Sequence, residues 1–315
     1  MARWVRIASV PGGEIQVRDT KDSEACLQEE MAVWEKRLLQ VTGDRPDLIV
    51  TPECCDRPAG MSFEERRLYY QVRGERMWEF FAEAARKFHT NIAYSAVRVM
   101  KDGSMRNAIQ MISRTGEVLG AYHKNVLVVD EYRKGGILYG RDTEAVETDI
   151  GRICGAICFD LNFDEPMKRT AAQKPDIVLF PSNYPGGFMQ NVWAYQTRSY
   201  FVSCVGYNQT ANIINPVGRV VAENGNYFPY LTASVNLDYQ VAHLDENWKR
   251  FEAMKKKYGP EVEMETPYGL GCTLLTYHGT ETSMKDIVRE FEIELWDDYY
   301  ARSLAEREKP GRLEP

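Results

Sequence analysis

Short apolar runs alternate with longer amphipathic stretches along most of the chain. The short runs are rich in β-branched residues, which is typical of buried strands. We expect these strands at Val5–Val10, Asp47–Pro52, Asn91–Val99, Ala108–Ser113, Val118–His123, Arg152–Phe159, Asp176–Pro181, Phe201–Tyr207, Ile213–Val221 and Ala233–Leu237. The longer stretches show helical periodicity. We expect these helices at Glu24–Val41, Phe63–Phe88, Asp164–Gln173, Gln190–Tyr200, Leu244–Lys257 and Ser283–Arg307.

This alternation predicts an α/β fold in which a mixed sheet system is covered by helices on both faces, with two sheets packed on each other. The chain shows no internal repeat, low-complexity linker or sharp change of composition. We therefore expect one main domain over residues 1–280. The charge-rich segment 281–315 follows it, and we expect this segment to be a helical extension that contacts another subunit.

The composition argues against nucleic acid and membranes as binding partners. The 315 residues have a formal charge of −7 and a pI near 5.4, whereas binding to nucleic acid or to an anionic membrane needs a basic face. No stretch reaches the roughly 20 consecutive apolar residues of a membrane span, and the apolar part of the N-terminus is too short for a signal peptide. We expect a cytoplasmic protein whose partner is a small molecule.

The cysteines and histidines predict neither a disulfide framework nor a metal site. The seven cysteines are scattered through apolar runs without a C-x-x-C pair, and most are expected to be buried thiols in a reducing compartment. The four histidines show no metal-ligand spacing.

Three reactive side chains each stand at the end of an apolar run. Glu53 ends DLIVTPE, Lys124 ends VLGAYHK and Cys158 lies in RICGAICFD. Because clefts form at the rim of a sheet, where strands end and loops begin, we expect the three to converge there. The thiol precedes a helix expected to begin near Asp164, and a helix N-terminus lowers the pKa of a nearby thiol. The carboxylate should be paired or have a raised pKa, because an unpaired charge is costly to bury.

Each of these residues alone has a simpler explanation. Glu53 could be a solvated strand-end acid, Lys124 a lysine that protects a strand edge, and Cys158 a half-buried structural cysteine. Together, however, the three groups supply what hydrolysis of a carbon–nitrogen bond needs. The thiol attacks and the carboxylate moves protons. The ammonium, with the backbone N–H of Phe159, stabilises the oxyanion.

The order Glu, Lys, Cys and the sequence around each residue resemble the nitrilase, or carbon–nitrogen hydrolase, superfamily. The resemblance spans roughly Val5 to Asp238. The similar stretches are DLIVTPE (Asp47–Glu53), AYHKNVLVVDE (Ala121–Glu131), GAICFDLNFDEP (Gly155–Pro166), DIVLFPSNYP (Asp176–Pro185) and WAYQTRSYFVSCVGYNQ (Trp193–Gln209).

The resemblance implies a fold, an assembly and a set of roles. The fold is an αββα four-layer sandwich, assembled into homo-oligomers of two or more subunits, with no metal or organic cofactor. Glu53 is the general base, Lys124 the oxyanion stabiliser and Cys158 the nucleophile. Glu131, seven positions after Lys124, matches an additional glutamate that helps to position the substrate and the lysine. The alternative for this residue is a surface acid.

The chain also departs from the family pattern after the cysteine. Asn162 and Asp164 stand where Arg and Pro are usual, and the first strand lacks a glutamine that many members have. The nitrile-hydrolysing branch usually has Trp-Glu after its cysteine, so Phe159 and Asp160 favour a small linear amide or an N-carbamoyl compound. A nitrilase with the same triad is one alternative. A catalytically silent protein that binds a metabolite or acts as a scaffold is another.

The walls of the substrate pocket are expected to come from loops near the same rim. The candidates are Tyr132, Arg133, Asn183, Tyr184 and Trp193. Arg133 could bind a substrate carboxylate through its planar guanidinium. The aromatic members of this set could equally be core or interface residues.

Overall fold

The computed structural model describes residues 1–207, 210–225 and 227–314. These residues form two compact units. We call Val5–Ser234 the large unit, and Met1–Trp4 together with Val235–Pro315 the small unit. Asn208 and Gln209, which end one of the stretches similar to the nitrilase superfamily, lie outside the described residues.

The first six-stranded sheet has the strand order β12-β1-β2-β3-β4-β5. Its strands are β1 (Trp4–Ser9), β2 (Leu48–Val50), β3 (Asn91–Val99), β4 (Met105–Ile112), β5 (Val118–His123) and β12 (Leu231–Asn236). The pairs β1–β2 and β2–β3 are parallel, whereas β3–β4 and β4–β5 are antiparallel. The ends of β2 and β5 and the beginning of β4 therefore meet at one rim of this sheet.

The second six-stranded sheet has the order β11-β10-β9-β8-β7-β6. Its strands are β6 (Val146–Thr148), β7 (Gly151–Gly155), β8 (Ile177–Ser182), β9 (Tyr200–Val205), β10 (Asn212–Ile214) and β11 (Val220–Glu223). The three central strands β7, β8 and β9 run parallel, so the loops that follow β7 and β8 lie at a shared edge.

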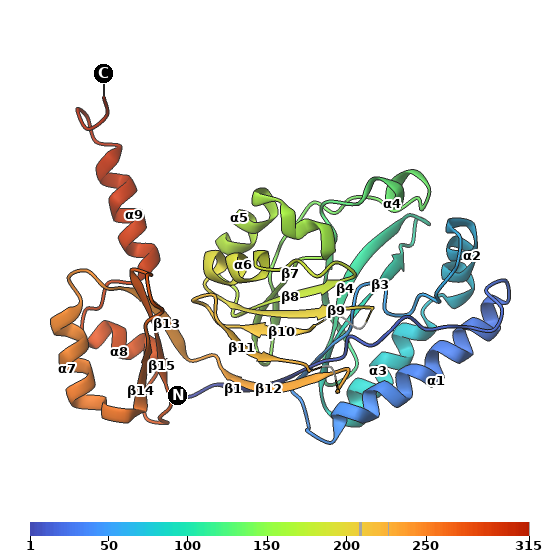
Figure 1. Ribbon diagram of the computed structural model, residues 1–315, viewed down its shortest axis with the longest axis horizontal. Helices are drawn as coiled ribbons and strands as arrows, with labels where there is room; N and C mark the ends of the chain where they lie inside the picture. Colours follow the sequence, from blue (N-terminus) through green and yellow to red (C-terminus); the bar gives the residue numbers. More distant parts are fainter. Residues whose placement is uncertain (208–209, 226, 315) are drawn as a thin grey trace. The chain divides into compact units, whose positions relative to one another are not determined.

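The two sheets face each other, and helices cover their outer faces (Figure 1). On the first sheet, α1 (Ser23–Thr42) and α3 (Arg76–Phe88) bury Trp34 and Phe81 against strand residues such as Ile49. On the second sheet, α5 (Asp164–Ala172) and α6 (Met189–Thr197) bury Met167 and Trp193 against Phe180. The large unit is thus an αββα sandwich, as the sequence predicts.

Gly155 at the end of β7 allows the sheets to approach closely just before Cys158. A Cβ atom at this position would lie 2.7 Å from Cδ1 of Ile109 and 2.9 Å from Cγ of Tyr122, which belong to the opposite sheet. Because such distances are shorter than van der Waals contact, a larger residue would push the two sheets apart. The glycine therefore helps to bring the loop after β7 near the loop after β5.

The small unit has a three-stranded sheet of its own, with the order β13-β15-β14. Its elements are β13 (Tyr239–His243), α7 (Trp248–Tyr258), β14 (Val262–Glu265), β15 (Cys272–Tyr277), α8 (Met284–Glu290) and α9 (Trp296–Arg307). Helices α7 and α8 bury apolar residues, among them Phe251 and Ile287, in a separate core. The expected boundary at residue 280 differs from the division between the compact units, and the assignment of 281–315 to oligomer contacts stays a prediction.

Several expected elements are divided or missed. The helix expected over Phe63–Phe88 is two helices, α2 (Phe63–Arg73) and α3, because Gly74 between them adopts a φ of +54°. The C-terminal helix also divides, into α8 and α9, near Glu292 with a φ of +54°. The strands β14 and β15 were not predicted at all. Among the described residues, no helix combines the length and apolar character that crossing a membrane requires.

Candidate active site

Glu53 lies just beyond β2 at the rim where the two sheets meet. Its side chain is almost fully buried, with 5% of the residue exposed. Oε1 accepts hydrogen bonds from Nζ of Lys124 and Nδ2 of Asn107, both at 2.8 Å. Oε2 accepts one from the backbone N–H of Asn183 at 3.1 Å. The carboxylate is therefore held by donors from both sheets. Glu53 was expected either to be paired or to have a raised pKa, and the structure shows it paired.

Lys124 follows β5 and is the most buried of the three predicted catalytic residues, with 1% of its surface exposed. Its Nζ lies 2.8 Å from Oε1 of Glu53 and 2.8 Å from Oε2 of Glu131. A surface lysine at a strand edge would be solvated, so this position excludes that alternative. An ammonium between two carboxylates is fixed in place and stays protonated.

Glu131 is positioned by the short helix α4 (Val129–Arg133). Its Oε2 also accepts the N–H of Val128 at 2.8 Å, which anchors the carboxylate to the start of the helix. Its Oε1 accepts a hydrogen bond from Nδ2 of Asn107 at 3.1 Å. The side chain is 20% exposed and faces the lysine, so it is not a free surface acid.

Asn107 in β4 was missed by the sequence reasoning. Its amide donates to both Glu53 and Glu131, and only 1% of the residue is exposed. Its backbone carbonyl accepts the backbone N–H of Lys124 at 2.8 Å, so Asn107 is bonded to Glu53, Glu131 and the main chain of Lys124. The expected strand began at Ala108, one residue after this asparagine, and so left Asn107 outside it, whereas β4 begins at Met105.

Cys158 begins a 3₁₀ turn (Cys158–Asn162) directly after β7. Its backbone adopts a φ of +50°, which is uncommon for a residue other than glycine. The residue is 9% exposed. The thiol lies close enough to Glu53 and Lys124 for both charges to act on its pKa. The three predicted residues are therefore close together and shielded from bulk solvent.

The pKa values of the two reactive groups shift in opposite directions. Burial, followed by the negative charge of Glu53, raises the pKa of the Cys158 thiol to about 12, although Lys124 lowers it in part. Burial alone would raise the pKa of Glu53, but the adjacent Lys124 outweighs it and the pKa of this carboxyl is lowered. Near neutral pH the resting site therefore holds a neutral thiol beside an ionised carboxylate. The pKa of the Cys158 thiol is therefore raised, whereas a nearby helix N-terminus was expected to lower it.

Asp160 connects the turn at Cys158 to the loop after Lys124. Its Oδ2 accepts hydrogen bonds from the Tyr122 hydroxyl at 2.7 Å and from the N–H of Ile157 at 2.9 Å. Its Oδ1 accepts the N–H groups of Asn125 at 3.1 Å and of Val126 at 2.7 Å. The residue is fully buried, and this burial raises the pKa of its carboxyl to about 6.

The five candidate pocket residues have different positions. Tyr132 and Arg133 are exposed on α4, and the Tyr132 ring contacts that of Tyr139 at 5.9 Å. Asn183 donates to Glu53, and the neighbouring Tyr184 is 38% exposed at the same loop. Trp193 is instead completely buried in the core of the second sheet, where its Nε1 donates to the carbonyl of Leu161 at 2.9 Å. This ring packs between α6 and the sheet, so it does not form a pocket wall.

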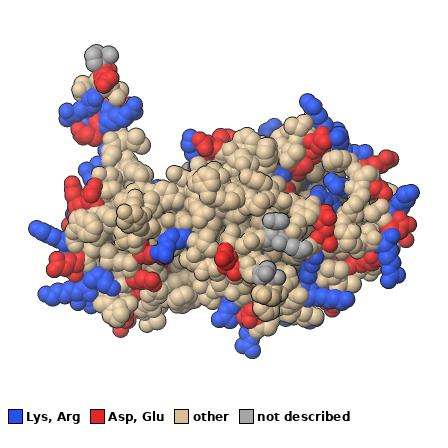
Figure 2. All heavy atoms as spheres, in the orientation of Figure 1, with Lys and Arg blue, Asp and Glu red and all other residues tan. Residues whose placement is uncertain are grey.

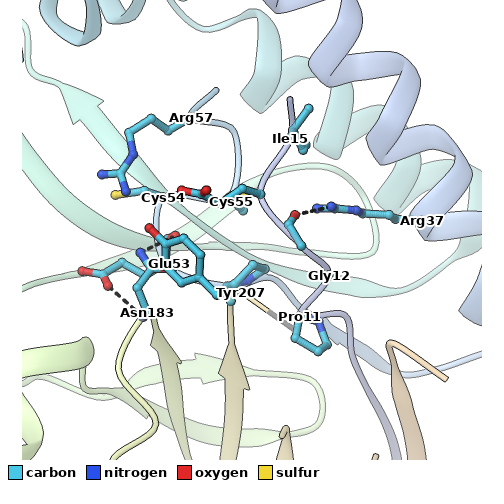
Figure 3. Close-up of a pocket in the computed structure, with 14 residues that line it drawn as sticks. Pro11, Gly12, Ile15, Arg37, Glu53, Cys54, Cys55, Arg57, Asn183 and Tyr207 are labelled. Carbon is cyan, nitrogen blue, oxygen red and sulfur yellow. Dashed lines mark hydrogen bonds between the residues drawn. The ribbon is translucent and has the colours of Figure 1, made fainter. Parts of the chain in front are cut away.

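A cavity opens on the side of Glu53 that faces the loop after β1. It is lined by Pro11, Gly12, Gly13, Glu14, Ile15, Arg37, Pro52, Glu53, Cys54, Cys55, Arg57, Asn183, Gly206 and Tyr207. Figure 3 shows the Arg57 side chain beside Cys54, with Glu53 and Asn183 below it. The cavity therefore brings a cation, a carboxylate and amide donors together.

Comparison with known proteins shows what the sequence and the fold of this chain are similar to. A sequence model described as "Carbon-nitrogen hydrolase" matches residues 27–243 of the chain. A curated relative, the 2-oxoglutaramate amidase of Bacillus subtilis (strain 168), is 22% identical over 230 residues. The match covers 67% of this chain and 85% of the relative.

Two solved structures share the fold. Saccharomyces cerevisiae Nit3, a member of branch 10 of the nitrilase superfamily, superposes with a TM-score of 0.61 at 17% identity, covering 82% of this chain and 95% of Nit3. A mutant amidase from Nesterenkonia sp. AN1, which shows Michael addition of acrylamide at its active-site cysteine, superposes with a TM-score of 0.59 at 16% identity. That match covers 73% of this chain and 92% of the amidase.

Proposed function

Because the chain belongs to the carbon–nitrogen hydrolase family, we propose that it hydrolyses a small linear amide or N-carbamoyl compound through a thioester at Cys158. The observation that carries this proposal is the position of Lys124, whose Nζ lies 2.8 Å from both Glu53 and Glu131 beside the buried thiol. A fixed ammonium next to a nucleophile and a base supports stabilisation of an oxyanion.

In the first half of the reaction Glu53 takes the proton of the Cys158 thiol, and the sulfur attacks the carbonyl carbon. The resting protonation states suit this step, because the thiol is neutral and the carboxyl is ionised. Lys124 and the backbone N–H of Phe159 stabilise the oxyanion. Glu53 then gives its proton to the nitrogen, and ammonia or an amine leaves as the thioester forms.

In the second half Glu53 takes a proton from water, which attacks the thioester. The acid is released and the proton returns to the sulfur. Glu131 does not exchange protons in this scheme. It holds Lys124 in place, and its own anchoring to Val128 keeps that contact fixed.

The amide assignment has two supports. The residues after the cysteine are Phe159 and Asp160 rather than the Trp-Glu usual in the nitrile-hydrolysing branch, and the relative from Bacillus subtilis is named an amidase. A nitrilase would use the same three residues, so matched amide and nitrile substrates must be compared. A silent binding protein is disfavoured because the chain keeps all three groups, with Glu53 and Lys124 paired and the thiol close to both charges.

Replacement of Cys158 tests the proposal. Cys158→Ser and Cys158→Ala should release no ammonia above background from a panel of amides, ureido acids and nitriles, while circular dichroism and thermal unfolding stay close to wild type. Cys154→Ala is the matched control, because Cys154 is a buried thiol in β7, the strand that leads to Cys158, and lies outside the site. This control should keep its activity.

Intact-mass spectrometry after rapid quenching supplies a second readout. The wild type should carry an acyl adduct at Cys158 during turnover, and neither Cys158 variant should. Ammonia release by Cys158→Ala at a rate near that of wild type would remove the thiol from the nucleophile role. A nitrile turned over much faster than its matched amide would instead support the nitrilase alternative.

A further inference from the structure

Arg57 is a second cation at the candidate active site, and none of the proposed steps uses it. It lines the same cavity as Glu53 and Asn183, and its guanidinium lies beside Cys54 (Figure 3). Its positive charge is felt at the catalytic carboxylate, where it contributes to lowering the pKa of Glu53 after burial and Lys124 have acted.

A tight turn fixes this position. The N–H of Arg57 donates to the carbonyl of Cys54 at 3.1 Å, which closes a turn over residues 54–57. Such a turn keeps its first and last Cα atoms within about 7 Å of each other. The Arg57 side chain therefore starts close to Glu53, and both side chains line one cavity, so a ligand that contacts both within it is short.

Arg57 has no carboxylate partner among the residues that the structure describes. The neighbouring acid Asp56 turns the other way, and its Oδ2 accepts from Arg73 at 2.6 Å and from the Tyr94 hydroxyl at 2.5 Å. The other acid of the cavity, Glu14, is exposed. A half-buried guanidinium that no described carboxylate contacts directly, and that always stays charged, is a ready binding group for a carboxylate.

We propose that Arg57 binds the carboxylate of the substrate, so that the preferred substrate is a short acid with a carboxamide or ureido group at its other end. This inference rests on the proposed function and specifies its substrate class. It replaces the expectation for Arg133, which is exposed on α4.

Charge balance supports the same conclusion. Glu53, Glu131 and Lys124 together have a net charge of −1, which would repel an anionic substrate at close range. With Arg57 included, the net charge of these four residues is zero. The positive charge of Arg57 lies in the cavity and not beside Lys124. Arginine also matches a carboxylate through two parallel N–H donors, which orients the acid as well as attracting it.

The test compares acidic and neutral amides of equal length. Ammonia release is measured with succinamate against butanamide and with glutaramate against pentanamide, using wild type, Arg57→Gln, Arg57→Lys and Arg66→Gln. Arg66 is the matched control, because it stacks on Phe63 at 4.9 Å near the same loop but does not line the cavity.

The wild type should prefer the acid of at least one pair by tenfold or more in kcat/KM. Arg57→Gln should reduce this preference by about 10- to 100-fold, mainly through a higher KM, as expected for loss of a charged hydrogen bond. Arg57→Lys should keep part of the preference, and Arg66→Gln should keep it.

Three results overturn the inference while leaving the proposed function intact. They are a wild type without preference for acids, a preference that survives in Arg57→Gln, and a parallel loss of activity on acidic and neutral amides. The last result would mean that Arg57 only balances the charge of Glu53. If neither Arg57 variant folds, the wild-type preference decides. No ammonia from any amide or ureido acid with folded wild type would contradict the proposed function itself.

Discussion

Asn107 acts on the two carboxylates through one amide group. Its Nδ2 donates to Glu53 and to Glu131 at 2.8 and 3.1 Å, in a place where the residue is 1% exposed. Lys124 already bonds to the same two carboxylates, so the amide adds a second bridge between them. We propose that Asn107 is a positioning residue that holds Glu53 in its ionised state and in register with Lys124.

Asn107→Leu tests this role with a side chain of similar size. Loss of two hydrogen bonds to charged groups should lower kcat/KM by about 10- to 100-fold. Since a donor to the ionised form is removed, the pKa of Glu53 should rise and the acid limb of the pH–rate profile should move to higher pH. Gln110→Leu, in the same buried strand, is the control. An unmoved acid limb in Asn107→Leu would contradict the positioning role.

The sequence identified the strand-end residues better than those within strands. Glu53, Lys124 and Cys158 were found because a polar or reactive group directly after an apolar run stands out. Asn107 lies inside β4 and next to the turn after β3, so its polarity looked like that of a loop residue. Arg57 was missed because the role proposed for it depends on a cavity formed by several loops, which no local pattern can show.

At the scale of elements, the carboxylate of Asp160 joins two loops that come from different sheets. Its four hydrogen bonds connect the turn at Cys158 with the segment after Lys124. Because those loops carry Cys158 and Lys124, we expect this buried acid to help to fix the distance between the proposed nucleophile and the ammonium.

Asp160→Asn should therefore destabilise the fold by about 2–3 kcal/mol, since an amide cannot accept from all four donors. The folded-state pKa of about 6 lies above the usual unfolded value near 3.9. Asp160 thus stabilises most below about pH 4, and this contribution is lost as the pH rises through 6. Asp160→Asn lacks this pH dependence. The difference in free energy of unfolding between wild type and this variant should therefore be smaller at pH 8 than at pH 4.

Urea unfolding at both pH values measures this effect. Asp164→Asn is the control, because the Asp164 carboxylate is 77% exposed and its ion pair with Lys168 is long at 3.9 Å. This substitution should change the free energy of unfolding by less than about 0.5 kcal/mol. A deficit of Asp160→Asn below 1 kcal/mol at pH 4 would show that the two loops hold together without this acid.

Elements were predicted well where the same pattern of apolar and polar positions continues from their first residue to their last. The strands β3 and β5 have the expected bounds, Asn91–Val99 and Val118–His123. The strand expected over Ile213–Val221 is instead a hairpin of β10 and β11, because the polar turn at Asn215–Gly218 interrupts it. The strand β14 was missed because its alternating glutamates resemble the charged end of the preceding helix.

For the molecule as a whole, the segment 281–315 has two parts with different surroundings. Helix α8 buries Met284 and Ile287 in the core of the small unit. At the start of α9, Trp296 and Tyr299 stack on His243 with ring centroids 5.0 and 3.6 Å away. The described residues from 301 onward are all exposed, and Figure 2 shows both signs of charge along this end of the chain.

Two truncations separate these parts. Removal of 281–315 should expose the core of the small unit and give insoluble protein or a melting temperature lowered by several degrees. Removal of 301–315 should leave the melting temperature of the monomeric unit nearly unchanged but reduce the molar mass, measured by light scattering, if this end contacts another subunit as we propose. An unchanged oligomer after the shorter truncation would contradict that proposal.

The left-handed backbone at residue 158 restricts how this rim could change during evolution. A branched Cβ fits poorly at a φ of +50°, and a left-handed conformation already costs an L-residue roughly 1–2 kcal/mol. An unbranched thiol or primary alcohol can occupy the position, whereas threonine meets a steric penalty before its reactivity matters. The main chain thus excludes a secondary alcohol as the attacking group, whatever substrate the cavity comes to accept.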